Sequence, residues 1–219
     1  MMNRRLLLST GAAALVAGTG LFMSRKDGSP LLVGMANAQE GEAREITEMV
    51  LGDPDAPVEV IEYASYTCPH CATFHANQLK ELKENYIDTG KIRFVYREVY
   101  FDRFGLWASM VARCDGSTDR FFAVTDQIYA NQSDWTASGD PAVMVEEFKK
   151  YAKIAGMEAA DLDACMEDAA YAQGLVEWYE TNAEADGISS TPSFIIDGES
   201  YSNMSYEDFA AVLDEKLEG

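Results

Sequence analysis

The feature that most constrains the fold of this chain is the tetrapeptide Cys68-Pro69-His70-Cys71. An apolar run over 58–64 precedes it with the composition of a buried strand, and an amphipathic run over 71–88 follows it with the spacing of a helix. When such a cysteine pair opens a helix, the first sulfur lies among unpaired backbone N–H groups, near the positive end of the helix dipole. A thiolate is stabilised there, so we expect the pKa of Cys68 to lie below that of a free cysteine.

A stabilised thiolate favours the reduced form of the pair, so the disulfide form readily oxidises other thiols. The motif therefore indicates thiol–disulfide exchange at Cys68 and Cys71, with their disulfide as the redox-active group and no separate cofactor. A metal-binding module is an alternative, because soft thiolates could bind copper(I). Structural zinc needs four ligands, and His70 is badly placed to complete a set with His75, so we expect no metal here.

Residues 1–38 have the pattern of an export signal. Two arginines, Arg4 and Arg5, precede an apolar stretch over 6–23, and the segment ends in Ala36-Asn37-Ala38, a small-x-small pattern that a signal peptidase cuts. The paired arginines resemble a twin-arginine signal, and an ordinary secretion signal is the alternative. A third interpretation is a retained membrane anchor, because 18 residues are close to the lower limit for spanning a bilayer. Each interpretation delivers the rest of the chain outside the cytoplasm.

The remaining 181 residues are strongly acidic. The whole chain has 17 basic and 37 acidic residues, and residues 1–38 contain four of the former and one of the latter, which leaves a net charge of −23. Such a surface repels nucleic acid, so that class of partner is excluded. The length suits one domain with a sizeable core, and we interpret the acidity as a source of solubility.

All four cysteines follow residue 38. An even number of cysteines in an exported protein indicates two pairs. Cys114 and Cys165 each lie in helical-looking sequence, and we expect them to form a structural disulfide. Two buried free thiols that pack as small apolar groups are the alternative.

The other segments predict an α/β fold that a long helical region interrupts. Two inner strands joined by one helix form a βαβ unit, whose strands should be parallel. The turn at Asp197-Gly198 is typical of a hairpin. In chain order we expect an edge strand over 46–51, inner strands over 58–64 and 92–99 with a helix over 71–88 between them, helices throughout 103–185, strands over 193–196 and 200–202, and a helix over 205–217.

Three stretches of the chain match the pattern of one known family. They are residues 62–71, which contain the Cys-Pro-His-Cys motif, residues 128–135, with the sequence Ile-Tyr-Ala-Asn-Gln-Ser-Asp-Trp, and residues 191–198, with the sequence Thr-Pro-Ser-Phe-Ile-Ile-Asp-Gly. With them the chain resembles the DsbA-type periplasmic thiol:disulfide oxidoreductases. The resemblance implies a thioredoxin fold with an inserted all-helical subdomain. After the signal peptide (1–38) that the residue pattern indicates, the chain then divides into a first thioredoxin-like part (39–102), a helical insert (103–185) and a second thioredoxin-like part (186–219).

The resemblance also implies roles for the residues of the motif. Cys68 is the exposed sulfur that a substrate thiolate attacks, and Cys71 is the shielded sulfur that closes the ring again. His70 is expected to donate a hydrogen bond or a positive charge toward the Cys68 thiolate, and a surface histidine without a role is the alternative. Pro69 stiffens the loop and removes one N–H group.

Two further positions support the active site by the same resemblance. Thr191-Pro192 corresponds to the family's cis-proline loop, where a substrate docks as an added strand and Thr191 tunes the lifetime of the mixed disulfide. An ordinary trans proline is the alternative there. Glu62 corresponds to a buried acid that accepts the proton of Cys71, and a solvated glutamate is the alternative. His75 stands where relatives often carry an acidic residue, which leaves the local charge balance open.

The resemblance implies a monomeric, periplasmic oxidase that introduces disulfides into exported proteins with free thiols. Its implied partner for reoxidation is a membrane quinone reductase of DsbB type. A disulfide isomerase or reductant on the same fold is the second hypothesis. Relatives with that function usually carry a dimerisation domain before the fold, and the roughly 20 residues between Ala38 and Val58 are too few for one.

Overall fold

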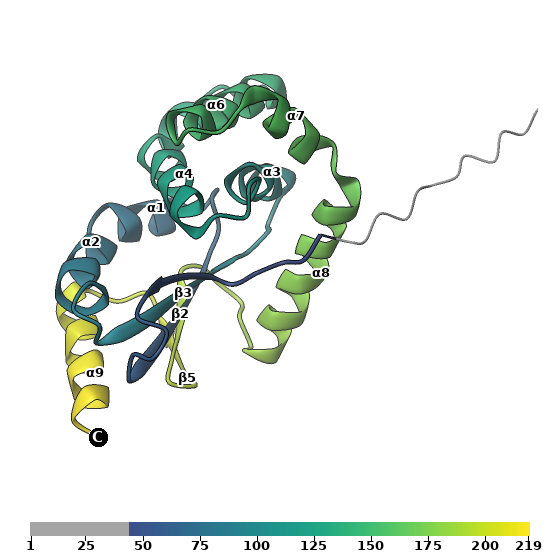
Figure 1. The fold of residues 1–219 in the computed structure, drawn as a ribbon. Helices are drawn as coiled ribbons and strands as arrows, with labels where there is room; N and C mark the ends of the chain where they lie inside the picture. Colours follow the sequence, from purple (N-terminus) through teal and green to yellow (C-terminus); the bar gives the residue numbers. More distant parts are fainter. Residues whose placement is uncertain (1–43) are drawn as a thin grey trace, which may run out of the picture. The chain divides into compact units, whose positions relative to one another are not determined.

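The computed structural model describes residues 44–219, which are built around a five-stranded mixed sheet (Figure 1). In sheet order the strands are β1 (Met49–Gly52), β3 (Ile92–Glu98), β2 (Val58–Ala64), β4 (Ser193–Ile196) and β5 (Glu199–Ser202). β2 and β3 are parallel, as predicted, and the other neighbouring pairs are antiparallel. The predicted signal peptide, residues 1–38, lies outside the described residues.

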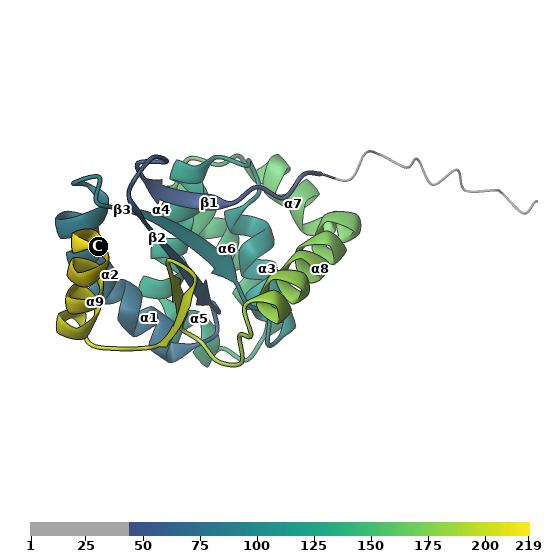
Figure 2. The same ribbon diagram turned by 90° about the horizontal axis from the view of Figure 1, so that it is seen from below.

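Helices cover both faces of the sheet, as expected for inner strands that carry bulky residues on both sides. On one face, Phe194 of β4 lies between aromatic rings of α1 (Pro69–Ala76) and α9 (Tyr206–Glu218), with ring centroids 4.8 and 4.9 Å away. On the other face, Tyr63 of β2 is buried in a smaller cluster with side chains of α8 (Ala169–Ala185). Figure 2 shows the strands between α9 on one side and α8 on the other.

The prediction of one continuous helix over 71–88 is wrong. The helix starts earlier, with Pro69 as its first residue, and it is divided into α1, α2 (Gln78–Leu82) and a π-helical turn, η1 (Lys83–Ile87). The break is at Asn77, whose dihedral angles are not helical (φ −121°, ψ −82°). Its side chain donates to the carbonyl of Thr73, in the preceding turn, at 2.9 Å.

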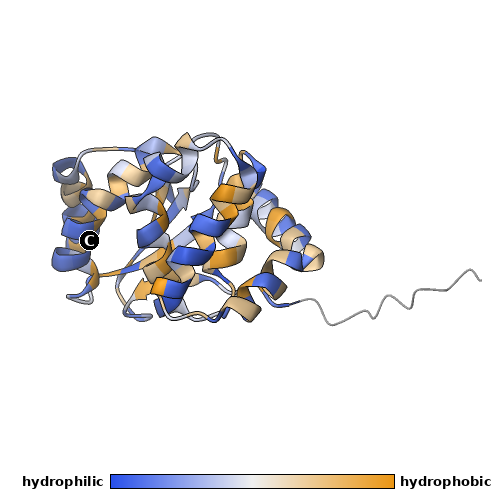
Figure 3. Cartoon of the chain, turned by 90° about the horizontal axis from the view of Figure 1, so that it is seen from above, coloured by the Kyte–Doolittle hydropathy of each residue, from blue (hydrophilic) through white to orange (hydrophobic). Residues whose placement is uncertain are grey.

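Six helices separate β3 from β4, in agreement with the helical spacing over 103–185. The helices in Figure 3 carry both hydrophilic and hydrophobic residues, as expected where one side of a helix is buried. A disulfide joins Cys114, just after the first of them, to Cys165 in the fifth. The six are α3 (Arg103–Ala112), α4 (Thr118–Ala130), α5 (Gln132–Ala137), α6 (Pro141–Ile154), α7 (Ala159–Glu167) and α8.

The chain after the insert follows the predicted pattern closely. Asp197 and Gly198 both have positive φ angles (45° and 81°), which form the tight turn between β4 and β5. Ser205 caps α9 by accepting a hydrogen bond from the N–H group of Asp208 at 3.2 Å. Among residues 44–219, the structure contains no helix with the length and apolar character needed to cross a membrane.

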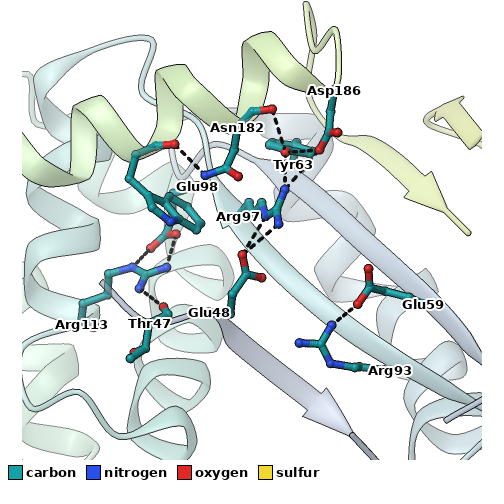
Figure 4. A network of polar contacts seen from close by, with 11 residues as sticks. Thr47, Glu48, Glu59, Tyr63, Arg93, Arg97, Glu98, Arg113, Asn182 and Asp186 are labelled. Carbon is teal, nitrogen blue, oxygen red and sulfur yellow. Dashed lines mark hydrogen bonds and ion pairs between the residues drawn. The ribbon is translucent and has the colours of Figure 1, made fainter. Parts of the chain in front are cut away.

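A buried ion pair joins the sheet to the insert (Figure 4). Arg113, which follows α3, donates to both carboxylate oxygens of Glu98 on β3 at 2.5 and 2.6 Å, and both side chains are fully buried. The same guanidinium donates to the carbonyl of Thr47 at 2.8 Å, and the Ser109 hydroxyl donates to Glu98 at 3.2 Å. Because the two charges meet in a bidentate pair with further hydrogen bonds, the cost of burying them is offset.

A second cluster in Figure 4 holds α8 on the sheet. Arg97 of β3 donates to Glu48 at 2.9 Å, to the hydroxyl of Tyr63 at 2.7 Å and to Asp186 at 3.1 Å. The Tyr63 hydroxyl in turn donates to Asp186 at 2.5 Å. The cluster therefore links the segment before β1, the centre of the sheet and the end of α8.

Candidate active site

The two cysteines of the motif occupy different environments at the start of α1. Cys68 is the N-cap residue, with extended dihedral angles (φ −85°, ψ 117°), and Pro69 is the first helical residue. Both sulfurs are thiols in this structure; Cys68 is partly exposed and Cys71 is fully buried. The turn that carries them leaves the carboxyl end of β2, so the central strand of the sheet positions the pair.

The electrostatic surroundings separate the two thiols further. A hydrogen bond from the Cys71 thiol lowers the pKa of Cys68 to about 5; partial burial opposes this shift, while the Thr191 side chain and the backbone N–H groups of Cys71 and His70 support it. For Cys71 the direction is reversed: burial raises its pKa, and the Cys68 sulfur and the charge of Glu62 raise it further. The pair therefore consists of one sulfur that is stable as a thiolate and one that is stable as a thiol.

The support residues expected from the sequence lie around this pair in different ways. The imidazole of His70 is exposed, and this residue acts on Cys68 through its backbone N–H group. The Thr191–Pro192 peptide bond is cis, and the thiol of Cys68 donates to the carbonyl oxygen of Thr191 at 3.4 Å. The loop before β4 thus faces Cys68 directly.

Glu62 lies below the pair, buried in β2, and its side chain bonds to His75. The two side chains are 0 % and 3 % exposed, and Glu62 Oε2 lies 2.9 Å from His75 Nε2. Within the described part of the chain, Glu62 Oε1 and His75 Nδ1 have no hydrogen-bond partner. The imidazole ring packs against Tyr129 of α4, with ring centroids 4.3 Å apart. It also lines a pocket of about 310 Å³ between α1 and α4, whose polar lining includes Asp126.

The pairing of Glu62 with His75 was not predicted from the sequence. A signal was present, because Cys71 and His75 are four residues apart and residues at that spacing share one face of a helix. The contact of Gln132 was not predicted either; its side chain bonds to two carbonyl groups of the active-site turn. Gln132 lies within residues 128–135, a stretch that carries the family resemblance, but no spacing rule links it to Cys68.

The remaining candidates lie apart from this cluster. Cys114 and Cys165 are bonded to each other within the insert; Cys114 lies just after α3 and Cys165 in α7. Among residues 44–219 there is no group of three or more His, Cys, Asp and Glu side chains arranged to hold a metal ion.

Comparison with known proteins places the chain among thiol–disulfide proteins. The thioredoxin family model matches residues 44–215. A relative from Rickettsia bellii, named "Putative protein-disulfide oxidoreductase", is 33% identical over 171 residues, which are 78% of this chain and 65% of that relative. The chain spans 60 to 65% of the length of this relative and four others from Rickettsia species.

Two solved structures have a similar fold. The structure of alpha-DsbA1 from Wolbachia pipientis is 27% identical, with a TM-score of 0.69, and the match covers 81% of this chain and 94% of that one. The structure of oxidised BdbD from Bacillus subtilis is 21% identical, with a TM-score of 0.70 and coverage of 78% and 94%. The second match concerns the fold alone.

Proposed function

The chain belongs to the thioredoxin family and has the DsbA-type fold, and we propose that it is a protein dithiol:disulfide oxidoreductase. In this proposal it acts as a disulfide oxidase that donates the Cys68–Cys71 disulfide to exported proteins. The observation that carries this proposal is the unequal pair. The pKa of Cys68 is lowered to about 5, whereas burial raises the pKa of Cys71. A pair whose reduced form is stabilised in this way is a strong acceptor of electrons from other thiols.

The reaction runs in two exchange steps. A substrate thiolate attacks the partly exposed sulfur of Cys68, a mixed disulfide forms, and the electron pair of the broken bond leaves on Cys71, which takes up a proton. A second substrate thiolate then attacks the substrate sulfur of the mixed disulfide, and Cys68 leaves as a thiolate. The substrate has lost two electrons and gained a disulfide, and Cys68 and Cys71 are reduced. Cys68 is the better leaving group because its pKa is the lower of the two.

Glu62 is the proposed proton carrier for Cys71. Its charge contributes to the raised pKa of Cys71, and both side chains are fully buried, so the proton of Cys71 needs a buried acceptor when the disulfide is formed again. His75 holds Glu62 through the 2.9 Å bond and lines the pocket beside α1. His75 therefore connects Glu62 to the pocket between α1 and α4.

The substrate is proposed to dock along the loop before β4. The carbonyl oxygen of Thr191 lies 3.4 Å from the Cys68 sulfur, so a peptide bonded to Cys68 lies beside the backbone of Thr191 and Pro192. The proposed substrates are unfolded or folding proteins with free thiols, because an extended segment can pair with this edge. His70, exposed at the rim, is positioned to contact such a substrate.

The proposed location is the periplasm, where disulfides persist, with residues 1–38 as the export signal or as a retained anchor. The proposed partner for reoxidation is a membrane quinone reductase of DsbB type, and the enzyme is proposed to act as a monomer whose redox-active group is the Cys68–Cys71 disulfide. The even number of cysteines and the Cys114–Cys165 disulfide support an oxidising compartment.

The test is oxidation of a reduced, unfolded acceptor protein by the oxidised enzyme, followed by counting the acceptor's remaining thiols. We expect one disulfide in the acceptor for each enzyme molecule, and no transfer from Cys68→Ala. The equilibrium with glutathione separates an oxidase from a reductant, because an oxidase is reduced by glutathione at low ratios of reduced to oxidised glutathione. Transfer that continues in Cys68→Ala, or an equilibrium typical of a reductant, would contradict the proposal.

A further inference from the structure

The side chain of Gln132 reaches from the helical insert into the turn that carries Cys68. Its Nε2 donates to the carbonyl of Tyr66 at 2.7 Å and to the carbonyl of Cys68 at 2.9 Å. The residue is 8% exposed, so these two bonds form out of contact with bulk water. An amide nitrogen has two hydrogens, and both are used on the same short stretch of backbone.

The insert presents this side chain from a fixed position. Gln132 is the first residue of α5, and one turn later Trp135 is 1% exposed, donates to the carbonyl of Ile128 at 2.9 Å and packs on Phe148. On the receiving side, Tyr66 is also anchored to the insert, because its hydroxyl lies 2.7 Å from the hydroxyl of Thr125 on α4. Both ends of the contact are therefore held by buried side chains.

The carbonyl of Cys68 is close to the reacting sulfur in the covalent structure. It accepts the first hydrogen bond of α1, from the N–H group of Ala72 at 3.2 Å, and Gln132 provides its second donor. The peptide nitrogen that follows it belongs to Pro69 and carries no hydrogen. The orientation of Cys68 relative to α1 therefore depends on these two donors, and that orientation brings its sulfur to the N–H groups of His70 and Cys71.

We propose that Gln132 is a positioning residue for thiol–disulfide exchange. Its two N–H···O bonds fix the turn from Tyr66 to Cys68, so that the Cys68 sulfur accepts hydrogen bonds from the backbone N–H groups at the start of α1. This inference rests on the proposed function only for its role in catalysis; the geometric role stands on the contacts alone. It gives the helical insert a part in the chemistry, since Gln132 belongs to the insert and Cys68 to the thioredoxin-like part.

The test is a graded series at position 132, with the thiolate absorbance of Cys68 titrated against pH. Gln132→Met keeps the length of the side chain and removes both donors, and Gln132→Glu places carboxylate oxygens against the two carbonyl groups. We expect the pKa of Cys68 to rise in Gln132→Met and to rise further, by about one unit or more, in Gln132→Glu. The equilibrium constant for reduction of the enzyme by glutathione should fall about tenfold for each pH unit by which the pKa of Cys68 rises. Ser133→Ala, an exposed neighbour in α5, is the matched control and should titrate as the unchanged protein does.

If Gln132 had a structural role alone, both variants would have a lower melting temperature and an unchanged pKa of Cys68. An unshifted titration in folded Gln132→Met and Gln132→Glu therefore overturns the proposal. If those two variants fail to fold, Gln132→Asn is tested instead, because its side chain keeps the amide and is one methylene too short to reach both carbonyls. An unchanged pKa of Cys68 in that variant also overturns the proposal. The titration needs no substrate, so an inactive but normally titrating enzyme would count against the proposed function and not against this inference.

Discussion

The lowered pKa of Cys68 predicts a specific pH dependence of stability that belongs to the reduced protein alone. The folded value is about 5 and the ordinary value is 9.0, so between these limits the reduced native state has lost a proton that the unfolded chain still holds. Stability therefore rises with pH in this window, and it is lost as the pH falls through the folded value. The oxidised protein has no thiol at Cys68 and lacks this dependence.

The magnitude follows from the width of the window. A difference of one bound proton changes the free energy of unfolding by about 1.36 kcal/mol per pH unit, which gives about 2.7 kcal/mol between pH 5 and pH 7. Cys68 is only partly buried, so solvent screening reduces the effect, and we expect about half of that value. For a chain of this size, this corresponds to about 3 to 5 °C in melting temperature.

The assay compares the melting temperatures of the reduced and oxidised proteins at pH 5, 6, 7 and 8. All other titrating groups contribute to both forms, so the difference between them isolates the cysteine pair. Between pH 5 and pH 7, we expect the melting temperature of the reduced protein to rise by about 3 to 5 °C relative to that of the oxidised protein. Cys68→Ala should follow the pH trend of the oxidised protein. A difference that stays flat or decreases over this range would show that the Cys68 thiolate is not stabilised by the fold.

Three further predictions concern residues around the site and in the core. His75→Gln should slow the attack of Cys71 on a glutathione mixed disulfide of Cys68 by about tenfold or more, because it interrupts proton transfer through Glu62. Stopped-flow measurements of this rate across pH test the prediction, and an unchanged rate contradicts it. Arg113→Met should reduce the free energy of unfolding, measured in urea, by about 3 to 5 kcal/mol, because it leaves the buried Glu98 unpaired. A loss below about 1 kcal/mol would contradict this prediction. Replacing both Cys114 and Cys165 with serine should cost about 2 to 4 kcal/mol, since their disulfide closes a loop of 51 residues, while the Cys68 titration stays unchanged.

The sequence predicted those parts of the fold that depend on local patterns. The strand over 58–64 was correct to the residue, because a short run with bulky side chains on both faces is typical of a central strand. The helix over 71–88 was predicted as continuous because its apolar spacing is continuous: Phe74, Leu82 and Tyr86 are buried on one side, as expected. Spacing does not report the non-helical dihedral angles of Asn77, the residue at which that helix is divided.

The parts of the site that could not be predicted depend on contacts between distant segments. Gln132 is 64 residues from Cys68 in the chain and belongs to a different helix. Its contact follows from how the insert packs on the sheet, which no local pattern describes. The bond between Glu62 and His75 was only partly predictable. The two residues are 13 positions apart, and each was recognised alone as part of the site. A charge pattern does not show that a residue of a strand faces a residue of a helix.

The topology of the sheet explains why an insert between β3 and β4 can take part in chemistry at Cys68. β2 and β3 are parallel and paired from Val58–Ile92 to Ala64–Glu98, so their carboxyl ends lie at the same edge of the sheet. β4 runs antiparallel to β2, so its first residue, Ser193, lies at that edge as well and follows Pro192 directly. The chain leaving β3 therefore starts the insert beside the active-site turn, and the hydroxyl of Thr67 donates to Asp102 at 2.7 Å, the residue that caps α3. An insert at the opposite edge would lie a full strand length from Cys68, about 20 Å for seven residues, and could not supply a donor such as Gln132 to its carbonyl group.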